Sequence, residues 1–412
     1  MEKKNVHVGS VDLTLYLVVI LLVGIGVVMV FSASYMTAAN RAIFDFDPFF
    51  FLRRNAIFAI MGFVAMNVLA YISYEFLRPF SLILYIICAV LLVVVMFIGV
   101  QSGGAVRWIP FPIIGRFQPS ELAKAAIIFT LAFLIERYPK ALHSWVGLIS
   151  YSALVGVMAA LVFYGGFSAS VIIAAIGFGM IFIASPHFWR FILAGGGLVG
   201  AVVGYLVLDQ MFFGGFRGRR FTAWLDPFSD QMGVGFQTVQ SLFAVASGGW
   251  FGVGIGQSRQ ASFIPEPHND IIFAIIVEEL GLVGAGMILI LFGVFIWRGI
   301  IIAIRAKDTF SSLVAIGIVF TVAFQTIINV AVVTNTIPNT GVTLPFISYG
   351  GTSLLVKMGL AGILLNISRY VKEEQPEPRR TKPRKSERER SNNRDGTNGR
   401  RKKRRRQLSR EN

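Results

Sequence analysis

Long apolar segments without charged side chains constrain this chain more than any other feature of its sequence. A helix needs about 20 predominantly apolar residues to cross the roughly 30 Å hydrocarbon core of a bilayer. Segments that meet this condition are 13–33, 55–74, 79–100, 188–208, 271–297 and, more weakly, 120–137. Only 15% of the residues are charged, against about 25% in soluble domains. A typical soluble enzyme is therefore excluded.

Two further stretches, 141–189 and 309–356, contain no Asp, Glu, Lys or Arg and are long enough to cross twice. The first breaks near Gly165-Gly166, and its last residues lead into the span at 188–208. The second breaks at the polar, proline-bearing stretch 335–345. We therefore predict an all-α polytopic membrane protein with about ten transmembrane helices in residues 13–370. The first span is too long for the apolar region of a cleavable signal peptide.

The basic residues are concentrated at the end of the chain. Residues 369–412 hold 18 of the 38 Lys and Arg but only 7 of the 22 Asp and Glu. Residues 371–412 lack apolar periodicity, so we predict a disordered tail. Because basic residues favour the cytoplasmic side, we expect the tail and residues 1–12 to be cytoplasmic. Anionic lipids of the inner leaflet suit a polybasic segment beside a membrane span better than nucleic acid does.

With both termini inside, the loops 101–119 and 209–270 lie outside, and both carry arginines against the usual bias. Loops this long are often functional, although solvated decoration or head-group anchoring would also explain the charges. Arginine binds phosphate oxygens through two parallel hydrogen bonds. The close trio Arg217, Arg219 and Arg220 is therefore the first candidate for binding a phosphorylated ligand, with Arg107 and Arg259 as secondary candidates. Trp108, beside Arg107, contacts either lipid head groups or that ligand.

Several ionisable residues fall within predicted spans. Glu121 and Lys124 are three residues apart and share a helix face, which indicates an ion pair at a helix start rather than catalysis. Intramembrane carboxylates such as Glu278 and Glu279 are costly and by default functional. On a helix that opens at Asp270, Glu278 lies about 80° and Glu279 about 180° from Asp270, so at most one shares its cavity. Pairing with Lys357 in the last span would be a purely structural use.

Four ordered motifs resemble the SEDS family (shape, elongation, division and sporulation), whose members are ten-span membrane proteins that polymerise lipid-linked peptidoglycan precursor. The motifs are QPSELAK (118–124), QSLFAVASGGWFGVGIGQSRQ (240–260), PEPHNDIIFAIIVEELG (265–281) and PNTGVTLPFISYGGTSL (338–354). Ser258-Arg259-Gln260 and the run Gly341–Pro345 are more similar to the FtsW and SpoVE branches than to RodA. The resemblance extends from about residue 13 to residue 370.

The resemblance implies roles for particular residues. The essential acidic residue of the family's long outer loop falls on Asp270, the expected general base, although Asn269 or Asp270 could simply cap the helix that follows. The family's Glu and Lys at the start of the fourth span fall on Glu121 and Lys124, and its loop Arg-Trp on Arg107 and Trp108. We also count His268 among the substrate-binding residues. One motif departs from the family's pattern. Residues Tyr164–Ser168 stand where the family commonly has Gln-Pro-Asp-Leu-Gly.

The resemblance also implies lipid II as substrate and a class B penicillin-binding protein, a transpeptidase, as partner, alongside other division proteins. A divalent cation, Mg²⁺ or Mn²⁺, is expected to assist departure of the lipid pyrophosphate. The outer loops show no carboxylate cluster that forms a metal cage, so the ion would be shared with the substrate phosphates. The single cysteine, Cys88, excludes an intrachain disulfide and a cysteine-based metal site.

Three functions remain open from the sequence. The first is a peptidoglycan glycosyltransferase of the cell membrane. The second is a transporter that flips the same precursor, for which Glu278, Glu279 and Lys357 would line the path. The third is a non-catalytic scaffold for division proteins, docked through its tail. We expect deletion of residues 375–412 to leave polymerisation largely intact, because every candidate site residue is predicted to lie on the other side of the membrane.

Overall fold

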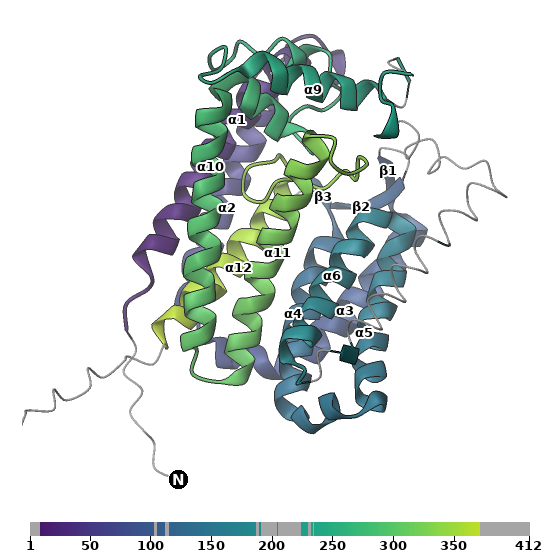
Figure 1. The fold of residues 1–412 in the computed structure, drawn as a ribbon, viewed down its shortest axis with the longest axis vertical. Helices are drawn as coiled ribbons and strands as arrows, with labels where there is room; N and C mark the ends of the chain where they lie inside the picture. The colour runs from purple at the N-terminus through teal and green to yellow at the C-terminus, as the bar shows by residue number, and fades with distance from the viewer. Residues whose placement is uncertain are drawn as a thin grey trace, which may run out of the picture. The chain divides into compact units, whose positions relative to one another are not determined.

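The computed structural model describes residues 9–102, 105–111, 115–186, 189–190, 204, 224–229, 232–233 and 235–370. Three predictions fall outside these residues: the arginine trio Arg217, Arg219 and Arg220, most of the span at 188–208, and the tail after residue 370. Figure 1 shows the arrangement of the elements.

Long helices make up most of the described chain. They are α1 (Leu13–Ala39), α2 (Phe50–Tyr71), α3 (Leu77–Ile98), α4 (Pro119–Arg137), α5 (Trp145–Gly165), α6 (Phe167–Ala184), α10 (Ile272–Arg305), α11 (Thr309–Val333) and α12 (Gly351–Arg369). Shorter helices are α9 (Phe236–Gly248), η1 (Ala42–Phe44), η2 (Tyr74–Phe76), η3 (Pro139–His143) and η4 (Gln260–Ser262).

Eight helices in the described residues are long and apolar enough to cross a membrane: α1, α2, α3 with η2, α5, α6, α10, α11 and α12. The weaker span predicted at 120–137 corresponds to α4. The prediction of a polytopic helical membrane protein is therefore confirmed. Helix α2 begins at Phe50, earlier than the span predicted at 55–74, and therefore includes Arg53 and Arg54.

Helix α4 has a weak apolar signal because it lies inside the protein. It packs against α3, α6 and α11, and most of its residues are buried, including the charged pair near its start. Small residues such as Ala123, Ala126 and Ala132 let neighbouring helices approach closely. A helix that contacts protein on most sides needs no lipid-facing surface and can carry polar groups.

Helices α2 and α12 pack closely along their length through glycines. A Cβ at Gly362 would collide with the backbone of Met66, and one at Gly351 would collide with the ring of Phe58. Small residues at such contacts are typical of helix packing in membranes, where van der Waals contact stabilises association.

The loop predicted at 101–119 contains a small sheet, which among the described residues is the one departure from the all-α prediction. Strand β2 (Ala105–Phe111) pairs antiparallel with β1 (Val100–Ser102) and with β3 (Gly115–Phe117). β-Branched and aromatic residues such as Val106, Trp108 and Ile109 favour a strand. Pairing also satisfies the backbone groups of a segment that lies against the helix ends.

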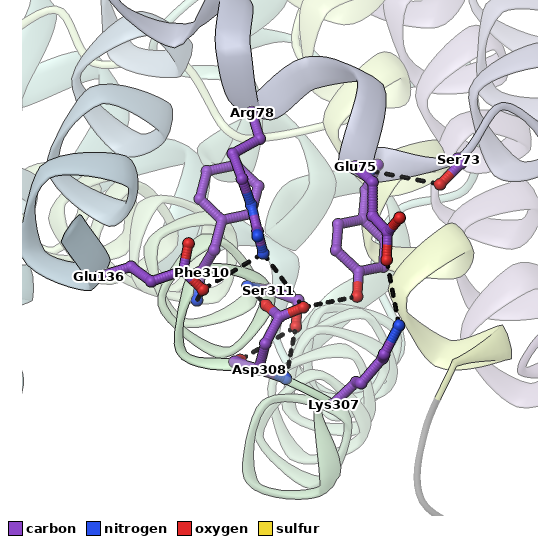
Figure 2. A network of polar contacts seen from close by, with 9 residues as sticks. Ser73, Glu75, Arg78, Glu136, Lys307, Asp308, Phe310 and Ser311 are labelled. Atoms are coloured by element: carbon purple, nitrogen blue, oxygen red, sulfur yellow. Dashed lines mark hydrogen bonds and ion pairs between the residues drawn. The ribbon is translucent and has the colours of Figure 1, made fainter. Parts of the chain in front are cut away.

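A network of ion pairs and hydrogen bonds joins several helix ends (Figure 2). These helix ends lie opposite the end that carries the sheet and α9 (Figure 1). Arg78 bridges Glu136 and Asp308 at 3.2 Å each, and Asp308 also accepts hydrogen bonds from the Tyr74 hydroxyl (2.9 Å) and the Ser311 N–H (2.8 Å). Burial alone would raise the pKa of the Asp308 carboxyl, but these partners together hold it below its ordinary value. The network ties α3, α4 and α11 together.

Candidate functional site

The site forms around a break in α10. Gly281 has φ +69°, so the helix is divided into a short segment, 272–280, and a long one. The loop after α9 supplies the lost hydrogen bonds. Val253 and Gly254 donate to the carbonyls of Glu278 and Glu279, and Gly249 and Trp250 accept from Leu282 and Val283. Non-helical backbone at membrane depth is tolerated where protein satisfies it. The loop after α9 thus satisfies the backbone groups that the break at Gly281 exposes.

Asp270 lies just before this short segment and is partly buried. Helix α10 begins at Ile272 with Ile271 at the N-cap, so neither Asn269 nor Asp270 caps it. The Asp270 carbonyl accepts a hydrogen bond of 2.6 Å from Nδ2 of Asn329 on α11. Its carboxylate lies beside Gly341, where a Cβ would stand 3.5 Å from Oδ2.

The segment 335–349, between α11 and α12, forms the wall beside Asp270. Side chains from several elements hold it. Three of them donate to its backbone carbonyls: Trp224 Nε1 to Asn335 O (3.0 Å), Ser168 Oγ to Thr340 O, and Asn329 Nδ2 to Val342 O (2.7 Å). The fourth, Gln237, accepts at Oε1 from the Asn339 side-chain Nδ2 (3.1 Å). The irregular stretch expected from the sequence is therefore an ordered part of the site rather than a plain helix break.

Beyond this wall lies a buried charged cluster. Glu121 and Lys124 form the predicted ion pair at 2.7 Å, with residue exposures of only 8% and 3%. Lys357, 5% exposed, lies near enough to both for electrostatic interaction and donates to the Thr343 hydroxyl at 3.4 Å. The cluster has two basic groups and one acidic group, and Thr343 connects it to the segment beside Asp270. Such an excess of buried positive charge attracts an anion.

His268 is only 2% exposed and does not face solvent. Its ring packs 4.2 Å from the Phe51 ring and 5.3 Å from the Tyr349 ring, measured between centroids, and its carbonyl accepts the Tyr349 N–H at 2.9 Å. Burial, assisted by the charge of Arg41, lowers the pKa of His268 to about 3. A neutral, enclosed imidazole fits a role in holding the loop before Asp270. Direct substrate binding by His268 stays a prediction.

Glu278 and Glu279 do not pair with Lys357, contrary to the structural use considered from the sequence. The Glu278 carboxylate accepts from the Ser258 hydroxyl (2.5 Å) and the Arg259 N–H (3.1 Å). The Glu279 carboxylate accepts from the Ser32 hydroxyl at 2.6 Å. Both side chains are thus used to fasten the loop 256–262 and α1 to α10.

Arg107 and Trp108 lie on β2, and both are partly buried. Arg107 Nε donates to the Gly165 carbonyl at 2.5 Å. A Cβ at Gly166 would stand 3.1 Å from Nε and 3.2 Å from Cζ of Arg107. The SEDS motif places its aspartate at this position, where an acidic side chain would meet the guanidinium. The substituted motif at 164–168 thus lies against Arg107.

The remaining candidates are dispersed around this end. Arg259 is exposed beside η4, and Glu266 is exposed with its carboxylate accepting from Asn269 at 2.6 Å. Among the described residues, no group of three or more His, Cys, Asp and Glu could hold a metal ion.

Sequence reasoning missed Asn329, which joins Asp270 to the wall. The sequence did indicate that Asn329 contacts protein, because it is a polar residue within the uncharged stretch 309–356. Polar side chains inside membranes commonly face protein. Which backbone groups it would bind could not be deduced from one sequence.

Comparison with known proteins gives a consistent result. The family profile described as cell cycle protein, covering FtsW, RodA and SpoVE, matches residues 12–373. Stage V sporulation protein E of Bacillus subtilis is 41% identical over 375 residues, covering 88% of this chain and 98% of that protein. A probable peptidoglycan glycosyltransferase FtsW of Geobacter sp. strain M18 is 37% identical over 367 residues, covering 88% and 98% respectively.

The fold also matches a solved structure. A chain from a peptidoglycan synthase complex, described as coordinating polymerization and crosslinking, aligns with a TM-score of 0.72 at 24% identity. It covers 88% of this chain and 99% of that chain.

Proposed function

Because this chain belongs to the FtsW/RodA/SpoVE family of cell cycle proteins, we propose that it is a peptidoglycan glycosyltransferase that joins lipid-linked disaccharide-peptide units into glycan strands. The observation that carries this function is the match along nearly the whole length of relatives named peptidoglycan glycosyltransferase. The arrangement around Asp270 supplies the chemical account.

The reaction forms one glycosidic bond and breaks one bond to phosphate. A sugar hydroxyl of the acceptor attacks the anomeric carbon of the donor, the bond from that carbon to the lipid pyrophosphate breaks, and the hydroxyl proton must leave. Asp270 is the proposed general base that accepts this proton. A positioned base contributes about 10²–10⁴-fold to such a step.

Two features support Asp270 in this role. It is partly rather than fully buried, so a substrate hydroxyl can reach it. Its backbone carbonyl is hydrogen-bonded to Asn329 on α11, which fixes the backbone position from which the carboxylate extends. Glu266, the nearest substitute, is exposed, and its carboxylate is engaged with Asn269.

Positive charge is expected to stabilise the departing pyrophosphate. Lys124 and Lys357 lie beyond Thr343, and Arg107 and Arg259 lie at the same end of the helices. Arg217, Arg219 and Arg220 keep their predicted role, although they lie outside the described residues. A divalent cation shared with the phosphates would neutralise the developing negative charge when bound.

We place the end that carries Asp270 on the outer side of the cytoplasmic membrane, with both termini inside. A class B penicillin-binding protein is the proposed partner, since the structural neighbour comes from a complex that combines polymerization and crosslinking. Anionic inner-leaflet lipids are the proposed partner of the tail.

The case for the alternative function, a transporter of the precursor, is weakened. Glu278 and Glu279, two of the three residues that would line a path, are occupied in fastening loops to α10. Reconstitution of the full-length chain with labelled lipid-linked precursor and Mg²⁺ or Mn²⁺ separates the functions. Glycan polymer supports the glycosyltransferase, exchange between leaflets without polymer would indicate a transporter, and neither would indicate a scaffold. The assay is run with and without the co-purified transpeptidase.

A further inference from the structure

We propose that Asn329 is a positioning residue for Asp270. Its side-chain amide joins the backbone at Asp270 to the segment beside the carboxylate, and this determines where the carboxylate stands. The inference rests on the proposed function of Asp270 as general base, and it adds a residue on a different helix to that site.

The geometry consists of one amide group with two short hydrogen bonds. Nδ2 of Asn329 donates to the carbonyl of Asp270 at 2.6 Å and to the carbonyl of Val342 at 2.7 Å. Carbonyl oxygens only accept, so the NH₂ end of the amide must face them, and both of its hydrogens are used. Asn329 is fully buried, which excludes a direct contact with bulk solvent.

The two joined segments are those that meet at the carboxylate. Asp270 lies in irregular backbone two residues before the first residue of α10. Val342 follows Gly341, where a Cβ would stand 3.5 Å from Oδ2 of Asp270. The amide therefore bridges the backbone of the base and the backbone of the wall against which the base lies. No regular helix or strand ladder supplies this connection, so a side chain does.

Loss of the amide has two separable consequences. It leaves two buried carbonyls without this donor, which destabilises the fold. It also frees Asp270 to shift relative to Gly341, and a displacement of about 1 Å at a catalytic group can cost about 10²-fold in rate. A merely structural residue would show the first effect only.

Asn366 provides a matched control in the same chain. It is also an asparagine with no exposed surface, on α12 near the opposite helix ends. Its Nδ2 donates to the carbonyl of Ala70 at 2.8 Å, and its Oδ1 accepts from the Tyr74 N–H at 3.1 Å. It thus bridges two backbone groups as Asn329 does, but remote from Asp270.

The experiment compares Asn329→Leu with Asn366→Leu in the full-length protein, reconstituted with labelled lipid-linked precursor and a divalent cation. Leucine keeps the branch at the γ-carbon and cannot donate; it is larger than asparagine, so the same substitution at the equally buried Asn366 controls for the added volume. We measure kcat, KM and the thermal unfolding midpoint of each variant, with Asp270→Asn assayed in parallel. The expected result is a fall of about 10²-fold in kcat for Asn329→Leu, with KM unchanged. Asn366→Leu is expected to lower the midpoint comparably and to keep kcat.

Each other outcome overturns the inference in a distinguishable way. Equal kcat losses in the two leucine variants would show a stability effect alone. A normal kcat for Asn329→Leu beside an inactive Asp270→Asn would overturn the positioning role and leave the base intact. An active Asp270→Asn would instead overturn the proposed base, and with it the reason for a positioning residue.

Discussion

Gly341 lies directly against the carboxylate of Asp270, with φ +66° and a Cβ position 3.5 Å from Oδ2. The absence of a side chain at this position has two effects. It allows a left-handed backbone conformation that L-residues adopt at a cost, and it leaves one side of the carboxylate next to bare backbone. The wall of the site therefore depends on a glycine.

Substitution Gly341→Ala tests this dependence. Alanine at φ +66° is strained by about 1–2 kcal/mol, and relief of the strain would move the segment that Asn329 holds beside Asp270. We expect a lower unfolding midpoint and a reduced rate of glycan polymerisation. Gly286→Ala is the control, since Gly286 lies within α10 and a Cβ there would meet nothing within 4 Å. Unchanged stability and rate in Gly341→Ala would contradict the argument.

A second prediction concerns the contact between Gly166 and Arg107. Gly166 has extended backbone with φ 170°, which any residue can adopt, and its Cβ position is 3.1 Å from Arg107 Nε. An aspartate at position 166 can pair with the guanidinium, whereas a leucine can only displace it. We therefore expect Gly166→Asp to keep the polymerisation rate and to change stability by no more than about 1 kcal/mol. Gly166→Leu should lower both the stability, measured by thermal unfolding, and the polymerisation rate, measured as precursor turnover. Similar behaviour of the two variants would count against a contact with the arginine charge.

A third prediction follows from the buried imidazole of His268. Burial, with a smaller effect of Arg41, lowers its pKa to about 3, against about 6.5 in an unfolded chain. Below pH 6.5 the unfolded chain binds a proton that the folded protein does not, so stability is fully present above pH 6.5 and is lost as the pH falls towards 3. This loss is at most about 1.4 kcal/mol per pH unit.

The variant His268→Phe keeps an aromatic ring between Phe51 and Tyr349 and removes the titrating group. The decrease in its unfolding midpoint between pH 7 and about pH 4.5 should be smaller than in the unmodified protein. Identical pH dependence of the two proteins would show that His268 is not kept neutral by burial.

Much of this architecture could be predicted from the sequence because the membrane imposes strong local rules. Apolar length identified the eight long apolar helices of the described residues, and the spacing of Glu121 and Lys124 identified their ion pair. The sequence did not reveal the partners of Glu278. The helical-angle argument assumed a helix that opens at Asp270, but α10 begins at Ile272 and is broken at Gly281. The partners Ser258 and Arg259 lie on a loop about 20 residues away, which only the tertiary fold brings to the carboxylate.

The segment around Asp270 shows the same limit. Its motif indicated an important acidic residue, but the bonds that hold it come from Asn329, 59 residues later. Contacts between residues so distant in sequence depend on how α10 and α11 pack, and no local pattern specifies them. The sheet at 100–117 was missed because a short stretch with two prolines and three glycines is typical of a loop.

The most direct test of the account is the polymerisation rate of Asp270→Asn in the full-length protein, reconstituted with labelled lipid-linked precursor and a divalent cation. Asparagine keeps the shape of the side chain and removes the base, and Glu266→Gln is the matched control on the nearest exposed carboxylate. The account predicts that Asp270→Asn loses at least about 10²-fold in rate with an unchanged unfolding midpoint, while Glu266→Gln remains close to the unmodified protein. Near-normal glycan synthesis by Asp270→Asn would contradict the account, and Glu266 would become the first replacement candidate.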